Sequence, residues 1–237
     1  MLKQFMIGEW NCLASDADAN APVLFEKFLS GALPKESVAL LSDGITGEVF
    51  KIEFAGKKYV LKRDRKRKHR FEKLVTSFFA GSNAFRLLRG LHRAASDSPD
   101  ARGGFAEVYL AADRRKWRFV LESFVLMEFV EGTGVGSLPD GLARYGNACA
   151  RIIRTLHAYG VIHGDVHPWN FIVSPDGGRV AAIDISGKAA TRYQRALDEL
   201  RVEERLGVKT EWGGGRFWRR LVRAHLQLRK WKNRAKE

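Results

Sequence analysis

Cysteine is scarce in this chain of 237 residues, which contains only Cys12 and Cys149. Two cysteines exclude a disulfide framework, and their spacing excludes a cysteine-based metal site, so we expect a reducing compartment. Long apolar runs are also missing. The start, MLKQFMIGEWNC, lacks the apolar stretch of a signal peptide, and no segment reaches the roughly 18 consecutive apolar residues of a spanning helix. We therefore expect a protein that is not exported and stays in the cytosol or on a membrane surface.

Acidic residues are few relative to basic ones, with 27 Asp and Glu against 41 Lys and Arg and a net charge of +14. This excess attracts polyanions, so nucleic acid, an anionic membrane and phosphorylated glycans are the candidate partners. Hydrophobic residues make up 45% of the chain, which favours a folded globule over a disordered chain. The length suits one domain or two closely packed lobes.

Glycine, proline and charge divide the chain into a strand-rich first part and a helix-rich second part. The first part is expected to hold two strands in 37–54, a third in 55–63, a helix in 71–92 and a hairpin in 106–132 that ends in an apolar strand. The second part is expected to begin with a helix over 142–159.

A polar loop, HGDVHPWN at 163–170, carries the chemistry that phosphoryl transfer requires. Asp165 lies five residues before Asn170, a spacing that lets the carboxylate face an acceptor hydroxyl while the amide oxygen reaches a metal ion. A predicted hairpin over 171–184 would deliver Asp184 as a second metal ligand. The pattern therefore predicts Asp165 as the catalytic residue, with Asn170 and Asp184 holding Mg²⁺.

Two histidines in the same loop have alternative roles. His163 is expected to face the core and brace the loop, with proton transfer as the less favoured role. His167 either contacts the γ-phosphate of a nucleotide or supports the loop from behind.

A nucleotide site is expected in the strand-rich part. Lys62 ends the alternating strand YVLK, comparable to the lysine that holds nucleotide phosphates, and the turn SDGITGEV at 42–49 resembles a glycine loop with its first glycine replaced by Ser42. The segment FVLMEFVEG at 124–132 is placed where backbone groups would bind adenine. The predicted ATP-binding residues are Gly44, Gly47, Val49, Lys62, Glu128 and Val130. A second glycine-rich stretch at 103–115, followed by Lys116, is rejected because it leaves no room for a helix before the adenine-binding strand.

The H-G-D-x-H-x-x-N loop resembles that of small-molecule kinases such as aminoglycoside and choline kinases. More narrowly, GDVHPWNFIVSPDGGRVAAIDISGK at 164–188 resembles the signature of the bacterial lipopolysaccharide core heptose(II) kinases. The resemblance implies an α+β, protein-kinase-like bilobal fold with a minimal C-terminal lobe, the lobes being 1–130 and 131–237. It also implies transfer of the ATP γ-phosphate to an inner-core heptose of the lipid A-core glycolipid, at the cytoplasmic face of the inner membrane.

Kinases of this type pair the strand lysine with a glutamate, and Glu72 is the candidate partner of Lys62. The alternative is that the helix face at 83–85 holds this position and lacks an acid. Only fifty residues follow the IDISG run, which leaves little room for a peptide-binding segment and makes a protein acceptor less favoured.

Two basic segments remain, at 62–73 and in the tail GRFWRRLVRAHLQLRKWKNRAKE from residue 215. The first is either a solvated face or a surface that engages the anionic acceptor. The tail is expected to be a helix whose apolar face, formed by Trp218, Leu221, Val222, His225 and Leu228, packs on the second lobe, anchors to an anionic membrane surface, or does both.

Alternative functions stay open. A kinase of aminoglycosides or aminoalcohols would need an acidic pocket, which the basic excess disfavours. A catalytically dead, nucleic-acid-binding protein would explain the charge but not the order of the motifs, so nucleic acid is not the expected partner.

Overall fold

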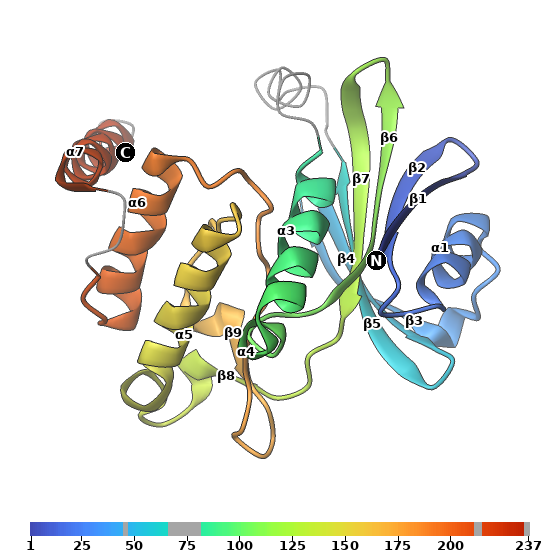
Figure 1. Ribbon diagram of the computed structural model, residues 1–237, viewed down its shortest axis with the longest axis horizontal. Helices are drawn as coiled ribbons and strands as arrows, with labels where there is room; N and C mark the ends of the chain where they lie inside the picture. Colours follow the sequence, from blue (N-terminus) through green and yellow to red (C-terminus); the bar gives the residue numbers. More distant parts are fainter. Residues whose placement is uncertain (45–46, 66–81, 211–214, 235–237) are drawn as a thin grey trace. The chain divides into compact units, whose positions relative to one another are not determined.

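The computed structural model describes the chain except for residues 45–46, 66–81, 211–214 and 235–237. The chain forms two compact units, one made of Met1–Arg102 with Ala106–Val130 and the other of Gly103–Phe105 with Glu131–Glu237. The first unit is built on a large sheet and the second mainly on helices (Figure 1). The protein is therefore of the α+β class, as the sequence predicted.

The first unit contains a seven-stranded sheet in the order β1-β2-β6-β7-β5-β4-β3, in which all neighbouring strands are antiparallel. Its strands are β1 (Leu2–Ile7), β2 (Trp10–Ser15), β3 (Val38–Gly44), β4 (Gly47–Phe54), β5 (Lys57–Arg65), β6 (Val108–Lys116) and β7 (Phe119–Glu128). Its helices are α1 (Ala21–Ser30), the 3-10 turn η1 (Lys35–Ser37), α3 (Asn83–Asp97) and α4 (Pro99–Arg102).

Residue alternation in β5 separates the side chains that face the core from those on the opposite face of the sheet. Tyr59 and Leu61 are buried in the core, whereas Lys62 lies on the opposite face because successive side chains of a strand alternate. The turn that leads into β5 is made at Gly56, whose φ of +75° is readily adopted only by glycine.

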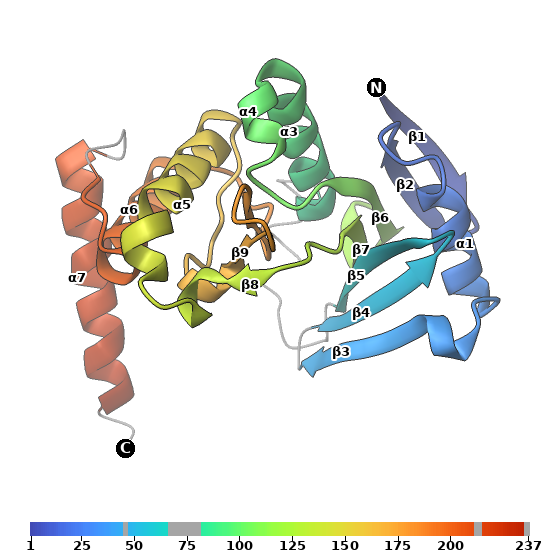
Figure 2. The ribbon, with the colours of Figure 1, turned by 90° about the horizontal axis from the view of Figure 1, so that it is seen from below.

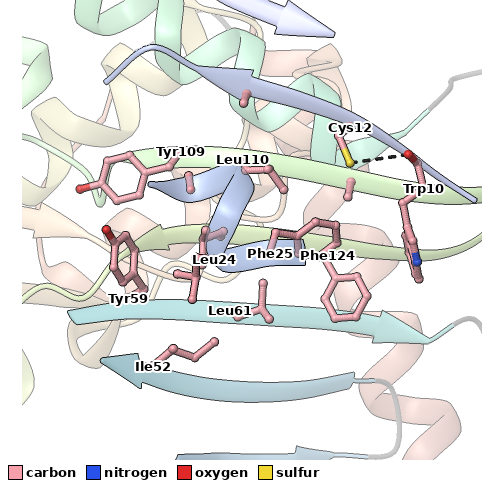
Figure 3. Packing of buried hydrophobic residues seen from close by; sticks show 14 residues of the cluster. Trp10, Cys12, Leu24, Phe25, Ile52, Tyr59, Leu61, Tyr109, Leu110 and Phe124 are labelled. Atoms are coloured by element: carbon pink, nitrogen blue, oxygen red, sulfur yellow. Dashed lines mark hydrogen bonds between the residues drawn. The ribbon is translucent and has the colours of Figure 1, made fainter. Parts of the chain in front are cut away.

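Helices cover both faces of the sheet, with α1 on one side and α3 on the other (Figure 1). On the α1 side the rings of Trp10, Phe25 and Phe124 meet edge to face, with centroids 5.0 to 6.1 Å apart (Figure 3). These rings come from β2, α1 and β7. The N-terminal hairpin and helix are therefore an integral part of the core.

The second unit combines α5 (Gly141–Ala158), α6 (Arg192–Arg201), the π-helical turn η4 (Val202–Leu206) and α7 (Gly215–Arg234) with a small sheet in the order β10-β9-β8. The sheet strands are β8 (Thr133–Gly134), β9 (Phe171–Val173) and β10 (Val180–Ala182), and the 3-10 turns are η2 (Val135–Ser137) and η3 (Pro168–Asn170). Figure 2 shows α6 and α7 side by side, where Val222 is buried against Ala196 and Leu200. No helix in the described part of the chain is long and apolar enough to cross a membrane.

Most elements expected from the sequence are present. The strands predicted in 37–63 are β3, β4 and β5, the helix over 142–159 is α5, and the hairpin after the polar loop is β9 with β10. Of the helix predicted for 71–92, the part up to residue 81 lies outside the described residues, and the rest is α3, which continues to Asp97. The structure adds β1, β2, α1 and α6, which were not predicted.

Candidate active site

The loop His163–Asn170 takes its shape from a glycine. Gly164 has a φ of +85°, and a Cβ at this position would lie 2.6 Å from the hydroxyl oxygen of Ser186. Ser186 is held there because its backbone N–H donates to the carbonyl of His163 over 2.9 Å. Both the backbone conformation and the available space therefore require glycine directly before Asp165.

Asp165 and Asn170 are joined by a hydrogen bond across the loop. The Nδ2 of Asn170 donates to the backbone carbonyl of Asp165 over 2.9 Å. Because this bond uses the amide nitrogen, the amide oxygen of Asn170 is the atom directed away from the loop backbone. The Asp165 side chain is 61% exposed, so its carboxylate is open to an incoming molecule.

Asp184 lies beside these two residues through the β9–β10 hairpin. The backbone N–H of Ile183 donates to the carbonyl of Asn170 over 2.9 Å, which places the next residue, Asp184, close to the end of the loop. Asp184 itself has a φ of +56°, an uncommon value for a non-glycine residue and one often found at functional sites. The structure thus brings Asp165, Asn170 and Asp184 into one site.

The two histidines of the loop differ in exposure. His163 is fully buried and its ring lies 5.4 Å from that of Phe171, between centroids, so it packs inside the unit. His167 is half-buried, and its Nδ1 accepts a hydrogen bond from the Trp169 backbone N–H at 3.4 Å. His167 therefore caps the 3-10 turn that ends at Asn170.

A buried carboxylate on α6 holds the start of the loop. Asp198 is 0% exposed and accepts hydrogen bonds from the backbone N–H groups of His163 at 2.9 Å and Gly164 at 3.1 Å. The Nε2 of His157 lies 3.3 Å from the same carboxylate. Asp198 was not predicted, because an aspartate within the helical stretch ALDEL gives only a weak signal that its side chain is buried.

Two arginines that follow Asp198 in the sequence donate hydrogen bonds to the same loop. Arg201 donates to the carbonyl of Gly164. Arg205 donates from Nη1 to the carbonyl of Val166 at 3.0 Å and to Oδ1 of Asp165 at 3.1 Å. Arg201 of α6 therefore holds the backbone before Asp165, and Arg205 of η4 orients the Asp165 carboxylate. Neither arginine was predicted to be part of the site.

The predicted phosphate-binding face lies in the strand-rich unit. Lys62 on β5 is paired with Val49 on β4, so both side chains lie on the same face of the sheet. Gly47 is opposite Gly44, and a Cβ on Gly47 would lie 2.4 Å from the carbonyl oxygen of Arg63. Close approach to β5 is thus one physical reason for Gly47, independent of any phosphate.

One of the backbone groups predicted to bind adenine already forms a hydrogen bond within the sheet. The N–H of Glu128 donates to the carbonyl of Glu107 over 2.8 Å, so this N–H is used within the sheet. Val130 is the last residue of the first unit. Glu72, the predicted partner of Lys62, lies outside the described residues. The helix that is described, α3, carries no acid before Asp97.

The rejected glycine-rich stretch has a structural role in the second unit. The carbonyls of Gly103 and Phe105 accept hydrogen bonds from Arg179 at 2.9 and 3.1 Å. Phe105 also forms a bridge with Ala182 of β10. This segment braces the hairpin that precedes Asp184.

Metal and thiol chemistry are both constrained by the side chains present. Among the described residues, no three His, Cys, Asp or Glu side chains gather in a group that could hold a metal ion. Asn170 and Asp184 carry hard oxygen atoms, and their backbones are linked closely through the Ile183–Asn170 hydrogen bond. Oxygen ligands of this kind suit Mg²⁺, an ion commonly bound through one or two carboxylates together with substrate phosphates. Cys12 and Cys149 are buried, and burial raises their pKa values to about 11 and about 12, which argues against a thiolate nucleophile.

A strand-rich unit with a lysine on a central strand, followed by a helical unit with an Asp–Asn loop and a hairpin-borne aspartate, is the arrangement of the kinase-like α+β class. The chain belongs to the family described as lipopolysaccharide core biosynthesis protein (WaaY), whose model matches residues 1–236. The resemblance found in the sequence is thereby confirmed.

Two curated relatives carry the name lipopolysaccharide core heptose(II) kinase WaaY. The protein from Escherichia coli strain K12 is 30% identical over 154 residues, which cover 65% of this chain and 64% of the relative. Another Escherichia coli protein is 31% identical over 154 residues, which cover 65% of each chain. The matched region therefore spans slightly less than two thirds of these relatives.

Solved kinase domains are more distant. The PknI kinase domain of Mycobacterium tuberculosis gives a TM-score of 0.44 at 18% identity, covering 70% of this chain and 72% of that one. The BubR1 kinase domain gives 0.41 at 16% identity, covering 79% of this chain and 50% of that one. Both are too distant to support a statement about what this chain binds.

Proposed function

We propose that this protein transfers the γ-phosphate of ATP to a hydroxyl of a heptose, heptose II in particular, in the inner core of lipopolysaccharide. The proposal is supported by two hydrogen bonds centred on Asn170, one from its Nδ2 to the Asp165 carbonyl and one to its own carbonyl from the N–H of Ile183, the residue before Asp184. The names of the two Escherichia coli relatives support heptose as the acceptor.

In this proposal Asp165 orients the acceptor hydroxyl and takes up its proton. Its carboxylate is exposed, which suits contact with a substrate, and Arg205 at 3.1 Å fixes its direction. Positioning of this kind supplies much of the rate in phosphoryl transfer, since the reaction demands little covalent chemistry from the protein.

Asn170 and Asp184 would hold Mg²⁺, which when bound neutralises charge on the transferred phosphoryl group. Lys62 would bind the nucleotide phosphates, and backbone groups at Gly44 and Gly47 would approach them. Adenine would be bound by backbone near Glu128 and Val130. The Glu128 N–H already donates within the sheet, so a contact from Glu128 would fall to its carbonyl oxygen.

We also propose that the enzyme works at the cytoplasmic face of the inner membrane. The support is α7, on which Phe217, Leu221, Leu228 and Trp231 are 43 to 69% exposed. Their spacing places them along one face of the helix, and the arginines of α7 supply positive charge for an anionic surface.

Phosphate transfer from labelled ATP to lipopolysaccharide that lacks core phosphate tests the activity. Asp165→Asn is expected to lower turnover by about 100-fold or more, since a general base typically contributes 10²- to 10⁴-fold, while ATP binding is retained. Asp97→Asn, which changes an exposed carboxylate at the end of α3, is the matched control and is expected to keep full activity.

Aminoglycoside, choline and a basic protein serve as competing acceptors in the same assay. Label on one of these and none on the glycolipid would reject the heptose assignment. Full turnover in Asp165→Asn would reject Asp165 as the catalytic residue.

A further inference from the structure

A basic cavity of about 450 Å³ lies in the strand-rich unit between α3 and the strands β1, β2 and β6. Four arginines line it: Arg86, Arg89, Arg93 and Arg115. Within the described part of the chain, no residue assigned to the nucleotide or to the catalytic loop lines this cavity. It is therefore a separate concave surface with a strong positive charge.

Helix geometry gathers three of these cations. Arg86, Arg89 and Arg93 are spaced three and four residues apart, so they lie on one face of α3. Like charges at this spacing destabilise a helix. Arg86 is half-buried, and this burial lowers the pKa of its guanidinium. An anion in the cavity would offset both effects.

The fourth arginine is fixed by a buried carboxylate. Asp113 is 0% exposed and accepts hydrogen bonds from Nε and Nη2 of Arg115 at 2.8 and 2.7 Å. The guanidinium carbons of Arg89 and Arg115 lie 5.8 and 5.9 Å from the centre of the Phe85 ring. Two cations are thus placed around a common aromatic ring before any ligand arrives.

The described residues that line this cavity or hold its arginines include four guanidinium groups but only one carboxylate, that of Asp113. Two polar neutral side chains lie at the strand side of the cavity, where Gln4 donates from Nε2 to Oδ1 of Asn11 at 2.9 Å. Guanidinium groups bind phosphate through two parallel hydrogen bonds, which a lysine ammonium cannot do. The composition therefore selects a compact group with multiple negative charges.

We propose that this cavity is a binding site for a phosphate monoester, distinct from the ATP site. Four guanidinium groups in a concave site suit a terminal phosphate, which carries more charge than the diester of a nucleic-acid backbone and can enter end-on. The monoester can be borne by a soluble sugar phosphate or by a lipid headgroup, and both present the same group to the arginines.

Titration calorimetry with inorganic phosphate tests the site in the full chain, with the ATP site saturated by a non-hydrolysable ATP analogue. Saturable binding is expected. Loss of a charged hydrogen-bonding partner in Arg86→Gln or Arg93→Gln should weaken it by about tenfold or more. Arg118→Gln, an equal change of charge in the β6–β7 turn outside the cavity, should leave the affinity unchanged.

Circular dichroism establishes that each variant is folded. If Arg86→Gln does not fold, Arg93→Gln decides, because its side chain is exposed and its removal leaves no buried gap. Absence of saturable binding overturns the proposal. So does an equal loss of affinity in Arg118→Gln, which would indicate general charge attraction.

The source of the phosphate is resolved by a second pair of probes, glycerol 3-phosphate and vesicles of phosphatidylcholine containing phosphatidic acid. If Arg93→Gln weakens binding of both glycerol 3-phosphate and the vesicles, the site accepts a lipid-borne monoester as well as a soluble one. Weakening only with glycerol 3-phosphate assigns it to soluble esters. Weakening in neither arm overturns the proposal.

Discussion

Asp198 shows how one side chain can determine the shape of the loop that is proposed to be catalytic. A buried carboxylate is costly unless donors surround it, and Asp198 has two consecutive backbone N–H groups and the ring of His157 within hydrogen-bonding distance. These bonds fix the backbone one residue before Asp165. Asp198 is thus expected to be a positioning residue, which acts on Asp165 through the backbone of the loop.

Replacement of Asp198 by asparagine is expected to misplace the loop, because an NH₂ group replaces one of the two carboxylate oxygens and cannot accept a hydrogen bond from His163, Gly164 or His157. Turnover should fall by about 10- to 100-fold, with the KM for ATP nearly unchanged, since small misplacements of reacting groups reduce rate more than binding. Steady-state kinetics on the glycolipid acceptor measures both values.

Glu204→Gln is the control, because Glu204 is an exposed acid on the neighbouring η4 turn. An unchanged kcat in Asp198→Asn, with a folded protein by circular dichroism, would contradict a positioning role. A loss confined to thermal stability would assign Asp198 to structure alone.

The helix α7 has two apolar faces, and this differs from the single face expected from the sequence. Val222 is buried, and Trp218 and Leu226 pack with it against α6. Leu221 and Leu228, which were predicted on the same face, are instead 43% and 60% exposed. Packing on α6 is thus confirmed for one face. The other face, with Phe217 and Trp231, remains exposed to solvent in the described chain.

The double substitution Phe217→Ser and Trp231→Ser is expected to weaken binding to anionic vesicles, because the aromatic rings of the wild type would insert at the headgroup boundary. Wild-type binding should also fall as salt rises, since each basic residue near such a surface contributes about 1 kcal/mol through screened attraction. Co-sedimentation with vesicles containing phosphatidylglycerol measures the effect.

Trp117→Ser is the matched control, since Trp117 lies in the β6–β7 turn and is 88% exposed. Equal binding by wild type and by the α7 double variant would rule out this face as a membrane anchor. Equal binding to neutral vesicles would rule out the charge contribution.

Folding stability of the whole molecule should depend on a partly buried ionic cluster that links the N-terminal segment to the sheet. The Oδ2 atom of Asp18 lies 2.7 Å from the Nζ of Lys57 and 2.9 Å from the hydroxyl oxygen of Tyr59. Burial alone would raise the pKa of Asp18, but hydrogen bonds from Lys57, the Asn20 amide and Tyr59 outweigh it and lower the pKa. Burial and Asp18 together raise the pKa of Tyr59 to about 12.

The stability difference between wild type and Asp18→Asn is therefore expected to depend on pH. A lowered pKa in the folded state stabilises the protein above the unfolded-state pKa of about 4, and this contribution disappears as pH falls through the folded-state pKa. At neutral pH the substitution should cost about 1–3 kcal/mol, the usual cost of breaking a charged hydrogen bond.

Urea denaturation at neutral pH and in acid measures this difference. Glu26→Gln, which changes an exposed acid on α1, is the control and should show little change. A cost that stays constant down to strongly acidic pH would contradict the ionic role of Asp18.

Local sequence patterns predicted much of the fold. Alternation in 37–63 predicted three strands, and the predicted hairpin after the polar loop is present as β9 and β10, whereas the roles of Asp165, Asn170 and Asp184 stay a prediction. The predictions of the strands and of this hairpin succeed because strand periodicity, turn residues and short loop spacings are properties of neighbouring residues. The N-terminal hairpin and α1 were missed, because their runs of apolar residues are short and the apolar positions are irregularly spaced.

The sequence by itself determined which chemical groups the proposed site contains. They are a carboxylate, an amide and a second carboxylate, in fixed order on a strongly basic chain. Tertiary structure alone decided what holds that chemistry in place and where the remaining charge gathers. Asp198 meets His163 across 35 positions, and Lys57 meets Asp18 across 39. The arginines of α3 meet Arg115 only because the helix packs against β6. Contacts between such distant residues depend on how elements pack, which no local periodicity encodes.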